Sequence, residues 1–269
     1  MRLAGVRPPL RRDSLGRIDT LDADMTPDEF KRIVRNRWPV PYALTEQVLA
    51  VIEPAVSVKR KVHRNEFRLS LDMLFLQAYK ALASVQLLAD YGHMEDGATI
   101  ARRLLELAAL AGYIARPDSR DVRLERSREF LSTLWRELPP AARKQLPPDA
   151  LNYWQQVSTP PDGRAGLPSI QAMFVELGRK DTYDDDYRFL AAIAHGGSPD
   201  QLIAYSRYTV RVRSLDHLGS ILGFGARYAL ATTVVWNDEY ALISPDVLQP
   251  TVKRVASWPE RKGGANNAA

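Results

Sequence analysis

The sequence predicts an all-helical bundle, and three observations favour this fold class. Helix start and stop signals recur along the chain, no segment alternates apolar and polar residues between hairpin turns, and no segment repeats another. The 269 residues, 45% of them hydrophobic, are enough for a substantial buried core. We expect a single helical domain over residues 26–245, preceded by a flexible basic segment (1–25) and followed by a flexible tail (246–269).

Capping residues and prolines bound the first two predicted helices. Thr26 can cap a helix over residues 27–38, which starts with a proline, and Glu29 can return a hydrogen bond to the cap. The next segment, "YALTEQVLAVIEPAV", has a helical composition. Pro54 predicts that this helix ends near Glu53, because the residue before a proline avoids the helical conformation.

Longer helices are predicted in the central part of the chain. Residues 68–91, "RLSLDMLFLQAYKALASVQLLADY", are rich in leucine and alanine and end at "GH", which favours a central helix. The segment "MEDGATIARRLLELAALAGYIARP" follows after a short connection, so we expect it to run antiparallel to the central helix. Two further helical segments are "RDVRLERSREFLSTLWREL" and, in a shorter form, "PPAARKQLPPDALNYWQQV".

A loop rich in proline and glycine, residues 157–169, separates these helices from the last part of the domain. After the helical segment "SIQAMFVELGRK", a helix is expected to start at Thr182, because Asp184, Asp185 and Asp186 suit the positive end of a helix dipole. Gly196 is expected to end it. A final helix is predicted over residues 214–240; its apolar part includes an arginine and three glycines, which favours a buried core helix over a membrane span.

The composition narrows the classes of function. The chain has no cysteine, which excludes disulfides, thiol catalysis and cysteine-ligated zinc and fits the cytoplasm. The basic N-terminus lacks the apolar segment of a secretory signal. No phosphate-binding glycine loop, H-E-x-x-H or G-x-S-x-G motif is present, and the four histidines are scattered. We therefore expect a cytoplasmic protein with no cofactor, no metal site and no membrane contact.

Arg188 and His195 are the residues that most suggest chemistry. They are seven residues apart, so both lie on one face of the predicted helix, about 10 Å apart along its axis. The residues between them are apolar, which predicts a buried helix on which a cation and an imidazole need partners. An arginine can bind a phosphate while a histidine transfers a proton, a combination that can cleave RNA without metal. Alternatively, His195 only stabilises the negative end of the helix.

Arg102 and Glu106 form a second polar pair. Their spacing places both on one face of the predicted helix, where they can form an ordinary surface ion pair. If that face points into the bundle, the two side chains are natural partners for His195 or Arg188. The sequence leaves both arrangements open.

An arginine and a histidine separated by six residues on a late helix resemble the HEPN superfamily, whose members include metal-independent RNases of toxin and antiphage systems. The blocks "ARRLLELAALAGYIARP" and "YRFLAAIAHGGSP" also resemble a bacterial helical family of unknown function, in which an Arg-x-x-x-Glu helix precedes a Tyr-and-His helix. The resemblance implies a HEPN-like bundle with Arg188 and His195 as the catalytic pair, supported by Arg102, Glu106, Tyr113 and Tyr187.

Two functions remain open at this point. The first is a HEPN-like endoribonuclease of a toxin or antiphage defence system, in which a homodimer joins two Arg188–His195 pairs into one cleft for RNA. The second is a non-catalytic helical module that binds nucleic acid or a partner protein of a defence system. Phe189 favours the second, because HEPN nucleases commonly carry a polar residue directly after the arginine.

Overall fold

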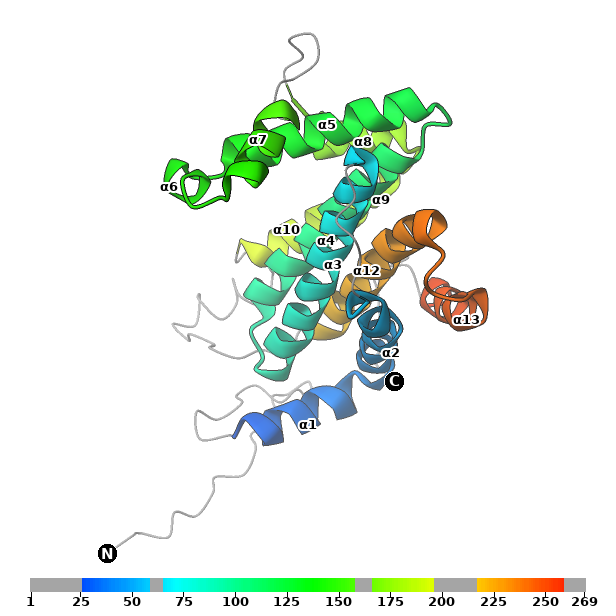
Figure 1. Cartoon of the computed structure of the whole chain (residues 1–269). Coiled ribbons are helices and arrows are strands. Elements are labelled where there is room, and N and C mark those ends of the chain that lie inside the picture. Colours follow the sequence, from blue (N-terminus) through cyan, green and yellow to red (C-terminus); the bar gives the residue numbers. More distant parts are fainter. Residues whose placement is uncertain (1–25, 59–64, 158–165, 196–216, 259–269) are drawn as a thin grey trace, which may run out of the picture.

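The structure, a computed structural model, describes residues 26–58, 65–157, 166–195 and 217–258 (Figure 1). Four predicted features lie outside these ranges: the basic segment 1–25, most of the loop 157–169, the helix end at Gly196, and the first residues of the final helix. All regular structure in the described ranges is helical, and the chain is an all-α helical bundle, as predicted.

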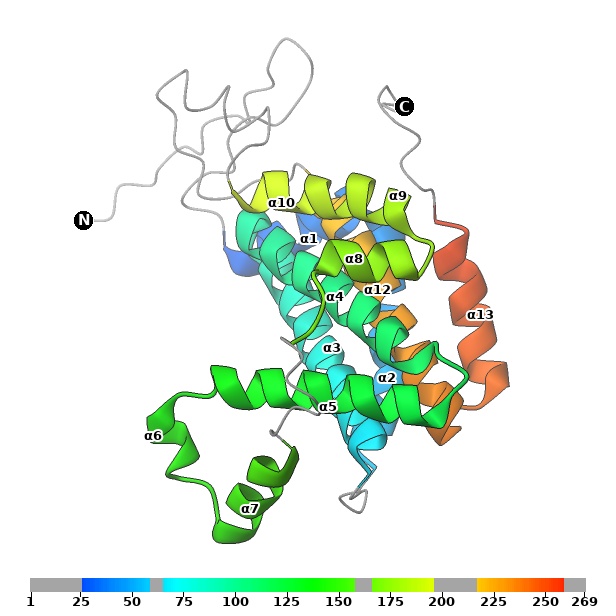
Figure 2. The same cartoon turned by 90° about the horizontal axis from the view of Figure 1, so that it is seen from above.

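Four helices form the centre of the bundle. α3 (Glu66–Asp90), α4 (Met94–Ala115) and α12 (Leu218–Tyr240) pack against one another, and α2 (Pro39–Val56) lies against α12 and α3 (Figures 1 and 2). α3 and α4 are antiparallel neighbours joined by a tight turn, in which Gly92 adopts a φ of 75°. This confirms the arrangement predicted from the short connection. The buried face of each helix is lined mainly by leucine, alanine and aromatic side chains.

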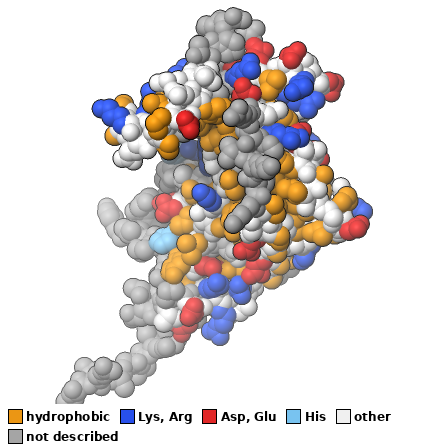
Figure 3. All heavy atoms as spheres, viewed as in Figure 1, with side chains coloured by type: hydrophobic (Ala, Val, Ile, Leu, Met, Phe, Trp, Pro, Cys, Tyr) orange, Lys and Arg blue, Asp and Glu red, His pale blue; other side chains and the backbone are white. Residues whose placement is uncertain are grey.

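The remaining helices surround this centre. α1 (Pro27–Arg37) contacts α2 and α3, α5 (Arg120–Glu137) packs on α3, and α8 (Ile170–Glu176) and α10 (Arg188–Ala194) cover α4. α6 (Pro140–Arg143) and α7 (Pro148–Val157) project from the body of the bundle beyond α5 (Figure 2). Figure 3 shows that, on the face of Figure 1, apolar side chains gather across the middle of the molecule, with charged ones mainly towards α5 and α1.

The predicted N-terminal cap is confirmed, whereas the predicted end of α2 is wrong. The backbone N–H of Glu29 donates to the Thr26 hydroxyl (3.3 Å), and the Glu29 carboxylate accepts from the Thr26 N–H (3.0 Å). α2 does not end at Glu53 but continues to Val56, with Pro54 inside its last turns. Ala55 is 4% exposed, so burial of this last turn outweighs the local preference of the residue before the proline.

The prediction of a flexible tail from residue 246 is also wrong for its first half. Residues Pro245–Ala256 form α13, which packs on α2 and α12. Leu248, Thr251 and Val255 are buried at helical spacing, and Gln47 of α2 donates to the Thr251 hydroxyl (2.9 Å). The prediction of a tail relied on the basic residues near the chain end and overlooked the helical spacing of these apolar residues.

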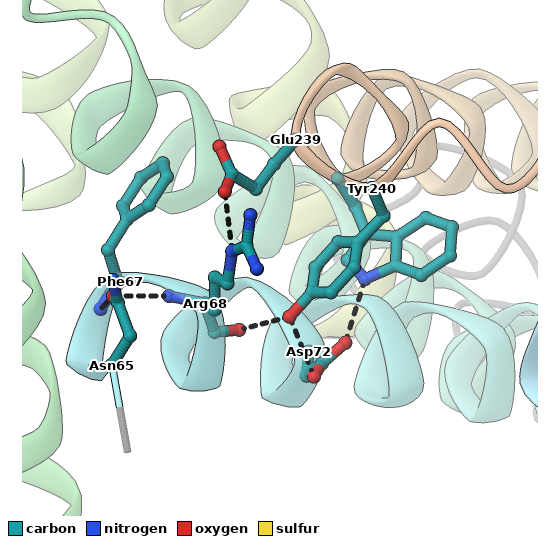
Figure 4. Close-up of polar contacts among 7 residues, drawn as sticks. Asn65, Phe67, Arg68, Asp72, Glu239 and Tyr240 are labelled. Carbon is teal, nitrogen blue, oxygen red and sulfur yellow. Dashed lines mark hydrogen bonds and ion pairs between the residues drawn. The ribbon is translucent and has the colours of Figure 1, made fainter. Parts of the chain in front are cut away.

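α12 is the core helix of the bundle. It is long and apolar enough to cross a membrane by composition, but 72% of its most apolar window is buried inside the described part of the chain. Its C-terminal end is tied to the start of α3, where Asp72 accepts from Trp236 Nε1 (2.9 Å) and the Tyr240 hydroxyl (2.8 Å) (Figure 4). Beside them, Arg68 Nε lies 2.6 Å from a carboxylate oxygen of Glu239. These contacts fix the C-terminal end of α12 against the start of α3.

Candidate functional site

Arg102 is at the centre of a polar cluster in which α4 meets the end of α10. Its Nη1 lies 3.4 Å from Nε2 of His195, its Nε lies 3.8 Å from Oε1 of Glu106, and its guanidinium carbon lies 5.7 Å from the ring centroid of Tyr187. His195 is exposed, and the side chains of Arg102 and Glu106 are 25% and 18% exposed. We call Arg102, Glu106, Tyr187 and His195 the α4–α10 cluster. It is half-buried on α4 and open to solvent at the histidine.

The structure thus brings together four of the six predicted site residues, with a different arginine beside the histidine. Arg188 does not meet His195; it forms an ion pair with Asp184 one turn earlier, at 3.2 Å, and its side chain is 70% exposed. The reason is directional, because helical side chains lean towards the helix N-terminus. Arg188 therefore reaches back to Asp184, whereas His195 lies beyond the last turn of α10 and points at α4.

Tyr113 lies apart from the cluster. It is eleven residues beyond Arg102 on α4, about 16 Å along the axis. The guanidinium of Arg126 lies 3.9 Å from its ring centroid and also donates to its backbone carbonyl (2.6 Å). Burial raises the pKa of the Tyr113 hydroxyl. These contacts join α4 to α5, which is a role in packing.

The segment that carries Tyr187 and His195 has an unexpected local structure. Thr182 does not cap a helix, because helical turns begin earlier, with α9 (Lys180–Thr182). The three aspartates then lie inside a π-helical turn, η2 (Tyr183–Tyr187), which leads directly into α10. A π-turn holds one more residue than an α-turn. Side chains after it are therefore rotated by about 100° about the helix axis from where a continuous α-helix would place them. The ring of Tyr187 stacks on that of Tyr183 at 4.8 Å.

Each of the three aspartates has a different environment. Asp185 is exposed, and Asp184 pairs with Arg188 at the surface. Asp186 points into the bundle, where it accepts a hydrogen bond from the Tyr228 hydroxyl and lies 3.9 Å from Nη1 of Arg227. The interpretation of all three as dipole partners at a helix start is therefore wrong. Asp186 anchors η2 on α12, and with it the segment that leads to His195.

Positive charge exceeds negative charge when Arg103, the neighbour of the cluster on α4, is counted with it. Glu106 is shared between Arg102 and Arg103, whose Nη1 lies 3.2 Å from the second carboxylate oxygen. One carboxylate thus faces two guanidinium groups. Burial and the negative charge of Glu106 raise the pKa of Tyr187, against the opposing effect of Arg102. At neutral pH the tyrosine is a neutral hydrogen-bond donor, and the excess of arginine favours an anionic ligand.

The contact between Arg102 and His195 joins a guanidinium nitrogen to a ring nitrogen. Because a guanidinium has only donors, a hydrogen bond between them requires the tautomer in which Nε2 of His195 accepts and Nδ1 holds the proton. If the guanidinium turns to a bound anion, Nε2 is released and can take up a proton beside that anion.

Sequence reasoning missed Arg103 and the two partnered aspartates. The spacings of Arg103 with Glu106 and of Asp184 with Arg188 are those of ordinary helical ion pairs, so the signal was present. The pairing of Asp186 with Tyr228 has no such local signal, because 42 residues separate them.

Among the described residues, no group of three or more histidine, aspartate or glutamate side chains could hold a metal ion.

In comparisons with known proteins, no family model, no curated protein and no solved structure matches this chain. The HEPN-like assignment therefore stays a prediction from the spacing of Arg188 and His195.

Proposed function

We propose that the chain is a metal-independent endoribonuclease of a toxin or antiphage defence system, with Arg102 and His195 as its reactive pair. One observation carries the proposal: a guanidinium and an exposed imidazole lie 3.4 Å apart, beside a carboxylate that two arginines share. The cysteine-free composition favours the cytoplasm as its place of action.

The proposed reaction uses the RNA itself as the nucleophile. Arg102 turns from His195 to the phosphate, which frees Nε2. Nε2 of His195 then takes the proton from the 2'-hydroxyl, whose oxygen attacks the adjacent phosphorus while the bond to the 5'-oxygen breaks. The products are a 2',3'-cyclic phosphate and a 5'-hydroxyl, which receives a proton. Arg102 stabilises the charge that develops on the phosphate oxygens.

A single imidazole that removes a proton from the 2'-hydroxyl cannot at the same time give a proton to the leaving 5'-oxygen. A second group must supply that proton. A homodimer that brings together two α4–α10 clusters would supply a second His195 in its protonated form, so the dimer belongs to this proposal. Tyr187 has a raised pKa and interacts with Glu106, so in this proposal it holds the carboxylate beside Arg102.

A second function, a non-catalytic helical module that binds nucleic acid or a partner protein, is favoured by a separate observation. Phe189, at the position after Arg188, packs edge-on against Phe224 at 5.9 Å, and Arg188 is neutralised by Asp184. On this second view the cluster binds a phosphate or a carboxylate without chemistry.

The experiment that separates these functions is RNA cleavage in excess EDTA with four single variants. We expect His195→Ala and Arg102→Ala to lower the cleavage rate by about 100-fold or more, as is usual for loss of a proton-transfer group or an oxyanion partner. Arg103→Ala is the matched control, because it removes a neighbouring arginine that also contacts Glu106 but not His195. It should change the rate less than about threefold, as for an exposed residue outside the reacting pair.

The fourth variant, Arg188→Ala, compares the pair predicted from sequence with the pair seen in the structure. A loss with Arg188→Ala but not with Arg102→Ala would show that the sequence-based pair is the reactive one. Absent cleavage, or equal cleavage by the wild type and His195→Ala, would remove the nuclease. Retained RNA binding in a gel-shift assay would then support the binding module.

A further inference from the structure

An apolar pocket of about 560 Å³ lies between α4, α8, α12 and α13, and it shares no residue with the α4–α10 cluster. Its volume falls within the range of about 300–1,000 Å³ that small-molecule sites occupy. A smaller pocket of about 300 Å³ adjoins it, because both are lined by Gly112, Leu177 and Val235. The two pockets form one groove along α4 and α12.

The pocket exists because small side chains face it from three helices. Ala108 and Gly112 on α4, Ala231 on α12 and Ala256 on α13 leave space that larger residues would fill. Leu177 lies closest to Gly112, where an added Cβ would meet its methyl groups at 3.4 Å. Apolar walls that remain open to water favour an apolar ligand, since its binding removes both surfaces from solvent.

The pocket also has a charged part. Arg227 and Arg179 both line it, and Arg227 is held in place by Asp186 at 3.9 Å and by its donation to the Trp258 carbonyl at 3.3 Å. Arg179 is exposed at the edge of the same pocket. Both arginines line the pocket, so an anionic group of a ligand can meet a guanidinium there.

The length of the pocket follows from α12. Arg227 and Val235 both line it and are eight residues apart, about 12 Å along the helix axis. An extended saturated chain advances roughly 1.3 Å per carbon, so about nine or ten carbons fit this distance. We propose that this pocket binds an unbranched aliphatic carboxylate of about this length, with its carboxylate at Arg227 and Arg179 and its chain along Ala231 towards Val235.

The test is isothermal titration calorimetry of the full-length protein with decanoate and with decan-1-ol. We expect saturable one-to-one binding of decanoate, and binding of the alcohol that is weaker by roughly tenfold, the usual effect of losing a charge-assisted hydrogen bond. No saturable binding of decanoate, or equal affinity for the acid and the alcohol, would overturn the proposal.

Three variants locate the site. Ala231→Trp fills the pocket from an exposed helical position and should abolish decanoate binding. Arg179→Gln should weaken decanoate several-fold without affecting decan-1-ol, and Arg120→Gln, an exposed arginine outside the pocket, should leave both unchanged. Circular dichroism checks that each variant is folded, and Arg179→Gln carries the test if Ala231→Trp is not. Undiminished binding by a folded Ala231→Trp would refute the site. A dimer that Ala231→Trp abolishes, without decanoate binding, would assign the pocket to a second copy of the chain.

Discussion

Replacing Asp186 by alanine tests whether a single buried carboxylate anchors the segment that carries His195. The Asp186 side chain is 13% exposed, accepts a hydrogen bond from the Tyr228 hydroxyl and lies 3.9 Å from Nη1 of Arg227. Tyr228 itself is only 5% exposed. Removal of the carboxylate leaves a buried hydroxyl without this acceptor, and that is the costly kind of deletion.

The expected loss of unfolding free energy is about 2–4 kcal/mol. A hydrogen bond to a charged group is worth roughly 1.5–3 kcal/mol, and the longer, partly screened contact with Arg227 adds less than about 1 kcal/mol. The same aspartate run supplies matched controls. Asp184→Ala loses an exposed ion pair worth a few tenths of a kcal/mol, and Asp185→Ala removes an exposed side chain and should be neutral within about 0.5 kcal/mol.

The assay is urea denaturation of the three variants at neutral pH, followed by circular dichroism. Adding Tyr228→Phe and the double variant closes a cycle, in which we expect a coupling of about 1.5–3 kcal/mol between Asp186 and Tyr228. If Asp186→Ala and Asp185→Ala lose the same stability within about 0.5 kcal/mol, the anchoring role of Asp186 is wrong.

Three further predictions concern the fold. Burial and the charge of Asp186 raise the pKa of Tyr228, so its contribution to stability is fully present below about pH 10, the unfolded pKa, and is lost as the pH rises above it. Tyr228→Phe should reduce the alkaline fall of the unfolding free energy, measured by urea denaturation, by about 1.4 kcal/mol per pH unit. Thr26→Ala removes the capping box and should cost about 1 kcal/mol in the same assay, whereas Thr26→Ser should not. Gly223→Ala places a Cβ 2.2 Å from the Trp258 ring and should lower stability by about 1–3 kcal/mol, whereas Gly97→Ala, with its nearest contact at 3.4 Å, should not.

Local signals in the sequence were sufficient for the first helix cap. Thr26 and Glu29 are three residues apart, so the cap and its reciprocal bond could be predicted from spacing alone. The end of α2 could not, because the burial of Ala55 depends on helices distant in sequence. The same holds for α13, whose packing on α2 and α12 stabilises a segment whose composition indicates a tail.

The candidate site shows the same division. The i, i+4 relation of Arg102 and Glu106 is local and confirmed, at 3.8 Å. The contact between Arg102 and His195 joins residues 93 positions apart in the sequence. Residue spacing could therefore not predict whether that face of α4 meets His195. The choice between Arg102 and Arg188 as the partner of His195 depends on side-chain direction at two different helix ends, for which residue spacing contains no information.

The π-turn links the two proposed sites. Helical spacing assumes one continuous register over residues 180–194, but η2 offsets its two sides by about 100°. Residues on the N-terminal side of this offset, Arg179 and Thr182, line the apolar pocket, and His195 on the other side reaches Arg102. Asp186, within the turn, bonds to Tyr228, which also lines the pocket. One anchored turn thus determines the direction of the pocket-lining side chains before it and of His195 after it. A ligand that moves Tyr228 or Arg227 would therefore act on the same segment that positions the imidazole.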